Sequence, residues 1–162
     1  MKKNKGFSLI ELLIVVAIIL VIAAIAIPNL LRSKAAANEA SAVGSLRSLN
    51  TAEVTYATTY PGTGFACTLA ALGPPNGGGS ATSAAAGLID TNLASGEKSG
   101  YSFSFLSTGN CTGTPALSYA TYASPVTAGT TGNRYFCSDS SGVIQYNPNG
   151  AISTCGTGTN PL

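Results

Sequence analysis

The run from Phe7 to Ile27 constrains this chain more than any other feature, because only Ser8 and Glu11 within it are polar. At 1.5 Å per residue a helix over this run is about 30 Å long, the hydrocarbon thickness of a bilayer. A helix that is apolar on every side predicts a membrane span or a helix packed among others. Glu11 is the exception, because a carboxylate in apolar surroundings is costly unless it has a partner.

Charge is concentrated before the apolar run, where Lys2, Lys3 and Lys5 favour a cytoplasmic N-terminus. The chain has eight basic and six acidic residues, but without these lysines five basic residues face the six acidic ones. The rest of the chain is therefore nearly neutral. It lacks the clustered Lys and Arg that indicate nucleic-acid binding, so no nucleic-acid partner is expected.

The second half of the predicted helix is one-sided. Pro28 removes a backbone donor and predicts a kink, and no further proline occurs before Pro61. Apolar residues then recur at steps of three, four or seven, which predicts one buried stripe. The stripe contains Ala35, Ala42, Leu46, Leu49, Glu53, Tyr56 and Tyr60. We expect one helix over 7–60, with a membrane or filament-core segment over 7–27 and an amphipathic half over 28–60.

The remaining residues, 61–162, predict a globular head. Residues 61–100 are rich in Gly, Pro, Ser and Ala, which is typical of a loop, with a short helix at 88–95. Residues 101–147 predict about four antiparallel strands in a meander, and 148–162 a C-terminal loop. The strands expected are 101–105, 117–123, 134–138 and 142–146, the last two forming a hairpin around a turn at 139–142.

Residues that carry catalysis or bind metals are scarce. The chain has no histidine, its six carboxylates are scattered, and Asp139 is more typical of a hairpin turn than of a calcium site. No phosphate-binding or dinucleotide-binding motif is present. We therefore expect no enzyme activity, no cofactor and no metal site.

The four cysteines are Cys67, Cys111, Cys137 and Cys155. None forms a CxxC pair, so a zinc site is not expected. An even number beyond a membrane segment is typical of two disulfides in an oxidising compartment, the alternative being four reduced and buried thiols. Four cysteines allow three pairings, and the residues alone leave them open.

A short basic leader ending in Gly6, followed by FSLIE and an apolar run, resembles the class III signal of type IV pilins and type II secretion pseudopilins. The resemblance implies that residues 1–6 are a leader, which a dedicated prepilin peptidase removes between Gly6 and Phe7. It also implies that the same peptidase methylates the new N-terminal residue, Phe7.

The resemblance also implies a role for Glu11, which would meet the Phe7 amine of a neighbouring subunit and set the axial register. Residues four apart share one helix face, and a carboxylate in the first turn complements the helix dipole by about 0.3–1 kcal/mol. The alternative is that Glu11 only caps the end of its own helix.

The fold implied is α+β, the type IV pilin fold, in which a long N-terminal helix packs against an antiparallel meander. Many type IV pilins close the C-terminal region with a disulfide, which implies Cys137 with Cys155. We expect Cys67 with Cys111 as the second pair, fastening the loop after the helix to the sheet.

The function implied is that of a major pilin, a structural subunit that forms a helical homo-oligomer with the help of an assembly machinery. Before assembly it would lie in the bacterial inner membrane with a periplasmic head, and afterwards in an extracellular pilus. One alternative is a type II secretion pseudopilin. Another is a minor pilin for adhesion or DNA capture, which the nearly neutral head and the presence of Glu11 disfavour.

The disulfide pairs can be tested by mapping peptides of the unreduced protein. We expect one linked peptide pair that contains Cys67 with Cys111 and a second that contains Cys137 with Cys155. A linked pair that joins Cys67 to Cys155 would show that the expected pairing is wrong.

Overall fold

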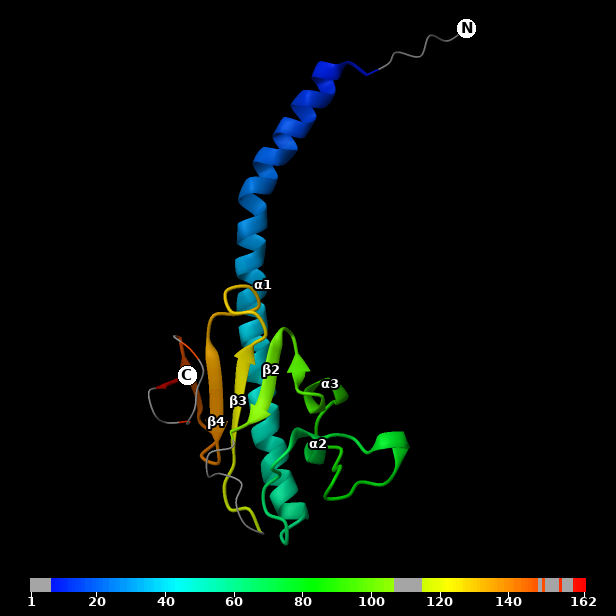
Figure 1. Ribbon diagram of the computed structural model, residues 1–162, viewed down its shortest axis with the longest axis vertical. Coiled ribbons are helices and arrows are strands. Elements are labelled where there is room, and N and C mark those ends of the chain that lie inside the picture. Colours follow the sequence, from blue (N-terminus) through cyan, green and yellow to red (C-terminus); the bar gives the residue numbers. More distant parts are fainter. Residues whose placement is uncertain (1–6, 107–114, 149, 151–154, 156–158) are drawn as a thin grey trace. The chain divides into compact units, whose positions relative to one another are not determined.

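The computed structural model describes residues 7–106, 115–148, 150, 155 and 159–162. Its contacts divide the chain into two units, residues 1–34 and 35–162, called here the N-terminal unit and the C-terminal unit. Helix α1 (Leu9–Thr59) begins in the first unit and continues in the second (Figure 1). The long N-terminal helix predicted from the sequence is thus confirmed. Pro28 lies inside α1 without ending it, and its kink stays a prediction.

The C-terminal unit buries one face of α1. The predicted stripe is buried from Ala35 to Tyr56, while Tyr60 is half-buried. Helix α1 ends at Thr59, directly before Tyr60 and Pro61. A residue that precedes a proline is disfavoured in helical conformation, so Pro61 accounts for this end.

A six-stranded antiparallel sheet packs on this face, with its strands in chain order (Figure 1). Its strands are β1 (Glu97–Lys98), β2 (Tyr101–Phe105), β3 (Ala120–Pro125), β4 (Tyr135–Asp139), β5 (Ile144–Asn147) and β6 (Asn160–Pro161). The predicted meander is confirmed, with two differences. It has six strands and not four, because the two edge strands are only two residues long and show no alternation that a sequence pattern could reveal. Strands β3 and β5 also begin later than the predicted 117–123 and 142–146.

Short helices occupy the segment between α1 and the sheet. They are α2 (Leu69–Leu72), the 3-10 helix η1 (Asn76–Gly78) and α3 (Thr91–Ala94). Helix α3 falls inside the predicted 88–95, and the Asp90 side chain caps it by accepting from the Leu93 N–H. In α2 the Thr68 side chain does the same for the Ala71 N–H.

The core forms where the sheet meets α1. Leu46 and Leu49 from α1 belong to the same buried cluster as Tyr101 and Phe103 from β2 and Phe136 from β4. Side chains alternate between the two faces of a strand, so Tyr101 and Phe103 share the face that meets the helix. The rings of Tyr101 and Phe136 lie 5.9 Å apart. Burial of apolar surface is thus the main force holding the sheet on α1.

Leu49 provides a test of this packing. Its side chain is 0% exposed, so Leu49→Ala should lower the free energy of unfolding by about 2–5 kcal/mol through lost burial and a cavity. Val54 is a matched control on the same helix, because it is 58% exposed. Val54→Ala should change stability by no more than about 0.5 kcal/mol. Thermal unfolding in detergent measures both, and equal losses would contradict the packing described.

Candidate functional site

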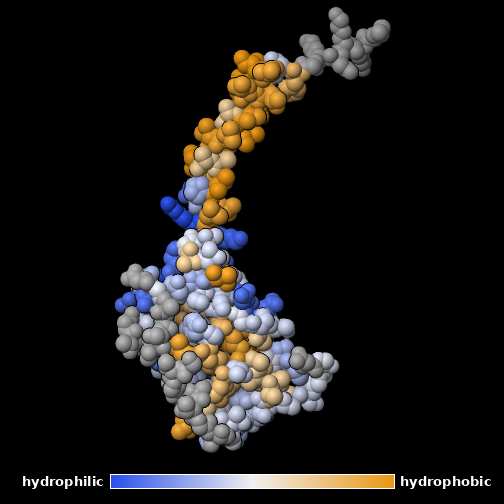
Figure 2. Space-filling view, in the orientation of Figure 1, coloured by the Kyte–Doolittle hydropathy of each residue, from blue (hydrophilic) through white to orange (hydrophobic). Residues whose placement is uncertain are grey.

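The apolar segment of the N-terminal unit is not covered by any part of the chain that the structure describes. Every large apolar side chain from Phe7 to Leu31 is exposed, and Phe7 itself is 85% exposed. Figure 2 shows this segment as a continuous hydrophobic surface. By length and composition alone, α1 could cross a membrane. Apolar surface of this extent marks a place where lipid or another protein chain binds.

Glu11 lies at the start of this segment and binds the end of its own helix. Ser8 precedes the first helical residue, and its C=O accepts from the Leu12 N–H at 3.3 Å, as an N-cap residue does. The Glu11 Oε2 atom accepts from the Ser8 N–H at 2.8 Å. This is one half of a capping box, S-x-x-E.

This capping bond forms within the single chain, and it leaves the Glu11 carboxylate able to accept further hydrogen bonds. Within the described residues, Oε1 of Glu11 makes no hydrogen bond, and a carboxylate can accept several. The cap was the alternative role expected for this residue. Pairing with a neighbouring amine stays a prediction, as do cleavage at Gly6, which lies outside the described residues, and methylation of Phe7.

Glu39 joins α1 to the loop between β3 and β4. Its Oε1 accepts from the N–H groups of Asn133 (2.8 Å) and Arg134 (3.3 Å), and its Oε2 lies 2.7 Å from Arg134 Nε. Burial raises the pKa of Glu39, but these hydrogen bonds and the guanidinium charge outweigh it, so the pKa is lowered. The loop also lies against Tyr101, because a Cβ on Gly132 would overlap the Tyr101 hydroxyl.

Glu53 joins α1 to the segment that follows it. Its Oε2 accepts from the Ala66 N–H at 2.8 Å, and its Oε1 is buried without a partner among the described residues. Burial raises the pKa of Glu53 to about 8, although the Ala66 bond opposes this. Glu53 is therefore mostly protonated at pH 7.

Glu39 was not among the residues singled out from the sequence. A signal was present, because Ala35, Glu39, Ala42 and Leu46 follow one another at steps of four, three and four. An acid at such a position indicates a buried carboxylate that needs a partner. The partner itself, 95 residues away, could not be read from the helix.

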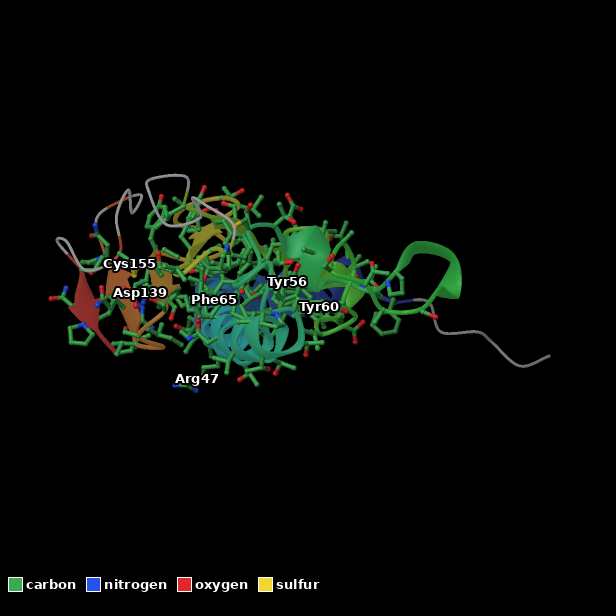
Figure 3. All side chains as sticks on the ribbon, turned by 90° about the horizontal axis from the view of Figure 1, so that it is seen from below. Arg47, Tyr56, Tyr60, Phe65, Asp139 and Cys155 are labelled. Atoms are coloured by element: carbon green, nitrogen blue, oxygen red, sulfur yellow. A yellow bond between two sulfur atoms is a disulfide. The ribbon has the colours of Figure 1, made fainter. Side chains whose placement is uncertain are left out.

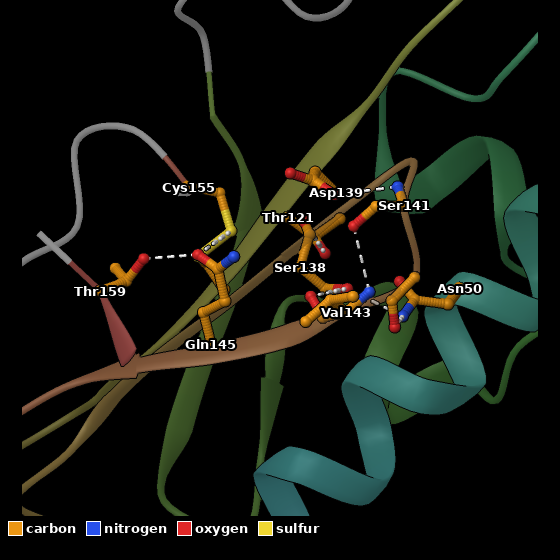
Figure 4. The surroundings of a disulfide bond; sticks show 11 residues. Asn50, Thr121, Ser138, Asp139, Ser141, Val143, Gln145, Cys155 and Thr159 are labelled. Carbon is orange, nitrogen blue, oxygen red and sulfur yellow. Dashed lines mark hydrogen bonds between the residues drawn. A yellow bond between two sulfur atoms is a disulfide. The ribbon is translucent and has the colours of Figure 1, made fainter. Parts of the chain in front are cut away.

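The C-terminal segment is tied to the outer face of the sheet. Cys137 and Cys155 form a disulfide, the pair that the resemblance implied. Phe136 faces α1, so the next residue, Cys137, points to the opposite face. Opposite Cys137 in the ladder lies Gln145, whose Oε1 accepts from the Thr159 hydroxyl (Figure 4). Cys111, the expected partner of Cys67, lies outside the described residues.

These features define a class of protein: an α+β domain carried by a single helix whose uncovered apolar end carries one carboxylate. The comparisons with known proteins make the class narrower. Residues 1–27 match the family model described as the prokaryotic N-terminal methylation motif. No solved structure matches the chain significantly.

Two curated relatives are similar to the chain. Over 54 residues it is 48% identical to the type IV major pilin protein PilA of Myxococcus xanthus. This match covers 33% of this chain and 24% of the relative. Over 39 residues it is 59% identical to the type IV wide pilus major component PilA4 of Thermus thermophilus. This match covers 24% of this chain and 30% of the relative. The matched part thus spans about a quarter to a third of either relative. Both names describe pilus components and neither describes an enzyme.

Residues 1–27 thus carry the N-terminal methylation motif, and part of the chain is similar to two components of type IV pili. The α+β fold, with a long N-terminal helix on an antiparallel sheet, is consistent with a type IV pilin.

Glu53 gives a prediction about pH. Its pKa is about 8 in the folded protein and near 4.5 when unfolded, so the folded state binds the extra proton between these values. Stability contributed by this group therefore falls as pH rises from about 4.5 to 8 and is constant outside that window. Glu53→Gln should flatten this part of the profile and raise the melting temperature at pH 8 relative to the parent chain.

Glu39→Gln is the matched control, because the pKa of Glu39 is lowered. Its contribution is present above about pH 4.5 and is lost as pH falls further. This variant should therefore lower stability by a constant amount above about pH 4.5 and change the slope of the profile only in the acidic limb. Thermal unfolding at a series of pH values measures both. A Glu53→Gln profile with the same slope as the parent would show that Glu53 does not titrate in this window.

Proposed function

We propose that this chain is the major structural subunit of a type IV pilus and polymerises through the apolar part of α1. The observation that carries the proposal is the uncovered apolar segment with one carboxylate, most of which lies within the N-terminal methylation motif of residues 1–27. The similarity of the chain to two pilus components supports it. In a filament, neighbouring apolar helices would cover this segment. Before assembly, lipid would cover it, with the C-terminal unit on the periplasmic side.

Processing would prepare the helix end for assembly. Cleavage between Gly6 and Phe7 by a prepilin peptidase would leave an amine, to be methylated, two residues before α1 begins at Leu9. A cation at this end opposes the helix dipole, so it gains from a nearby carboxylate. Cleavage thus creates a positive amine with which the Glu11 carboxylate can pair.

Glu11 would then set the register between subunits. Its Oε2 is held by the Ser8 N–H, which directs the carboxylate at the helix end, and its Oε1 can accept from the Phe7 amine of a neighbour. Two unpaired charges in an apolar filament core would each be costly, and pairing them offsets part of both costs. Lipid is already apolar, so transfer from the membrane gains little and an assembly machinery must drive it.

A type II secretion pseudopilin would share the class III signal and the helix. The two functions differ in where the product is found, since a major pilin is the main subunit of long surface filaments. Microscopy of sheared surface material, with mass spectrometry of its main subunit, separates them. A main subunit that begins at N-methylated Phe7 supports the proposal.

The role of Glu11 is testable by substitution. Glu11→Ala leaves the neighbouring amine unpaired in the filament core, which costs about 3–5 kcal/mol for a buried pair. Filament yield should fall at least about tenfold while leader cleavage proceeds, since each factor of ten is about 1.4 kcal/mol. Electron microscopy and the mass of the processed subunit measure the two effects.

Glu97→Ala is the matched control, because Glu97 is an exposed glutamate of the C-terminal unit. It should leave filament yield unchanged. Abundant, ordered filaments from a correctly processed Glu11→Ala protein would refute the register role of Glu11.

A further inference from the structure

Glu53 is the acid of α1 that lies deepest in the C-terminal unit. Its side chain is 0% exposed, and its Oε2 accepts from the Ala66 N–H at 2.8 Å. Its Oε1 is also buried and has no partner among the described residues. A neutral acid is tolerated in such a site, whereas a carboxylate there lacks both water and a countercharge. The proton on Glu53 therefore decides whether burial of this side chain is favourable.

The C-terminal unit has no cation available to pair with an ionised Glu53. Its basic residues are Arg47, Lys98 and Arg134. The last two are already in ion pairs, with Asp90 and Glu39. Arg47 is exposed, and because it is six residues from Glu53 it points about 120° away around the helix axis. Figure 3 shows Arg47 reaching outward from α1, away from Phe65.

The described titratable groups that interact with Glu53 are two tyrosine hydroxyls. Burial, the Glu53 charge and Tyr60 raise the pKa of Tyr56. Burial, the Glu53 charge and Asp139 raise the pKa of Tyr119 to about 12. Both hydroxyls therefore stay neutral where Glu53 titrates. The sequence places no charged side chain in residues 61–89 or 99–133. An ionised Glu53 would thus have no countercharge in these surroundings.

Residues 61–68, called here the connecting segment, lie against Glu53 and belong to no helix or strand. On the side away from α1, the Phe65 N–H donates to the Ala116 C=O at 3.0 Å, and the Ala116 N–H donates to the Thr63 C=O at 2.8 Å. The first two residues of the segment are exposed and the next three are half-buried, so it lies at the surface. A surface segment with few hydrogen bonds opens at a lower free energy than a packed sheet.

We infer that Glu53 is a pH-sensitive switch, in which the neutral acid holds the connecting segment on α1 and loss of its proton opens this segment while the sheet stays docked. Opening brings water to the carboxylate, and water then supplies the stabilisation that no cation of the unit provides. The sheet is held on α1 elsewhere, by the Glu39–Arg134 pair and by the buried cluster that contains Leu46 and Phe136. The switch operates within a single chain and is therefore independent of the proposed filament function.

Hydrogen exchange of the full chain in detergent, followed by mass spectrometry at a series of pH values, tests the switch. After correction for the pH dependence of exchange in an unfolded peptide, the connecting segment should open about tenfold more often per pH unit between about pH 5.5 and 7.5, because each opening releases one proton. Strand β2 should open at least about tenfold less often at every pH. Glu53→Gln should abolish the pH dependence, because glutamine keeps an acceptor for the Ala66 N–H and has no proton to lose.

Glu39→Gln is the matched control, since Glu39 is also a buried acid of α1 but its pKa is lowered. It should leave the pH dependence of the connecting segment unchanged. The switch is ruled out if the segment of the parent chain opens equally often at all these pH values, or only as often as β2. A pH dependence that persists in Glu53→Gln would also rule it out. If Glu53→Gln does not fold, the comparison of the segment with β2 in the parent chain decides.

Discussion

The need to cover the apolar surface of α1 determines how the rest of the chain is arranged. Between Ala35 and Tyr56 the helix has one apolar stripe, and the sheet covers it with side chains such as Phe103 and Phe136. Between Phe7 and Leu31 the large apolar side chains are exposed, and none of the described residues covers them. The second half of the helix is thus covered within the molecule, whereas the first half leaves an apolar surface of the kind that lipid or other chains bind.

The three glutamates of α1 all act as hydrogen-bond acceptors. Each accepts a hydrogen bond from a backbone N–H, at Ser8 for Glu11, at Asn133 for Glu39 and at Ala66 for Glu53. Their surroundings then separate them. Hydrogen bonds from Asn133 and Arg134, together with the guanidinium charge, lower the pKa of Glu39, whereas burial raises the pKa of Glu53 to about 8. Glutamate thus caps the helix at Glu11, forms an ion pair with an arginine at Glu39, and is a buried hydrogen-bond acceptor at Glu53.

The sequence predicted the long helix, the buried stripe and the antiparallel meander, because these depend on periodicities that continue over many residues. It did not predict the edge strands β1 and β6, since two residues form a strand only when a neighbouring strand offers hydrogen bonds. It also missed the tie between Glu39 and Arg134, which the folded chain brings together from distant positions. For Glu11 the sequence left two roles open, and the single chain shows the cap.

The strand order has a consequence for how the C-terminal unit folds. Neighbouring strands of the sheet are consecutive in the chain, so the sheet can grow by adding one strand after another, each closing a loop much shorter than the separation between α1 and the strands. Docking on the helix is different, because Glu39 and Asn133 are 94 residues apart. We therefore expect the rate of folding to be set by the attachment of a formed sheet to α1 and not by strand pairing.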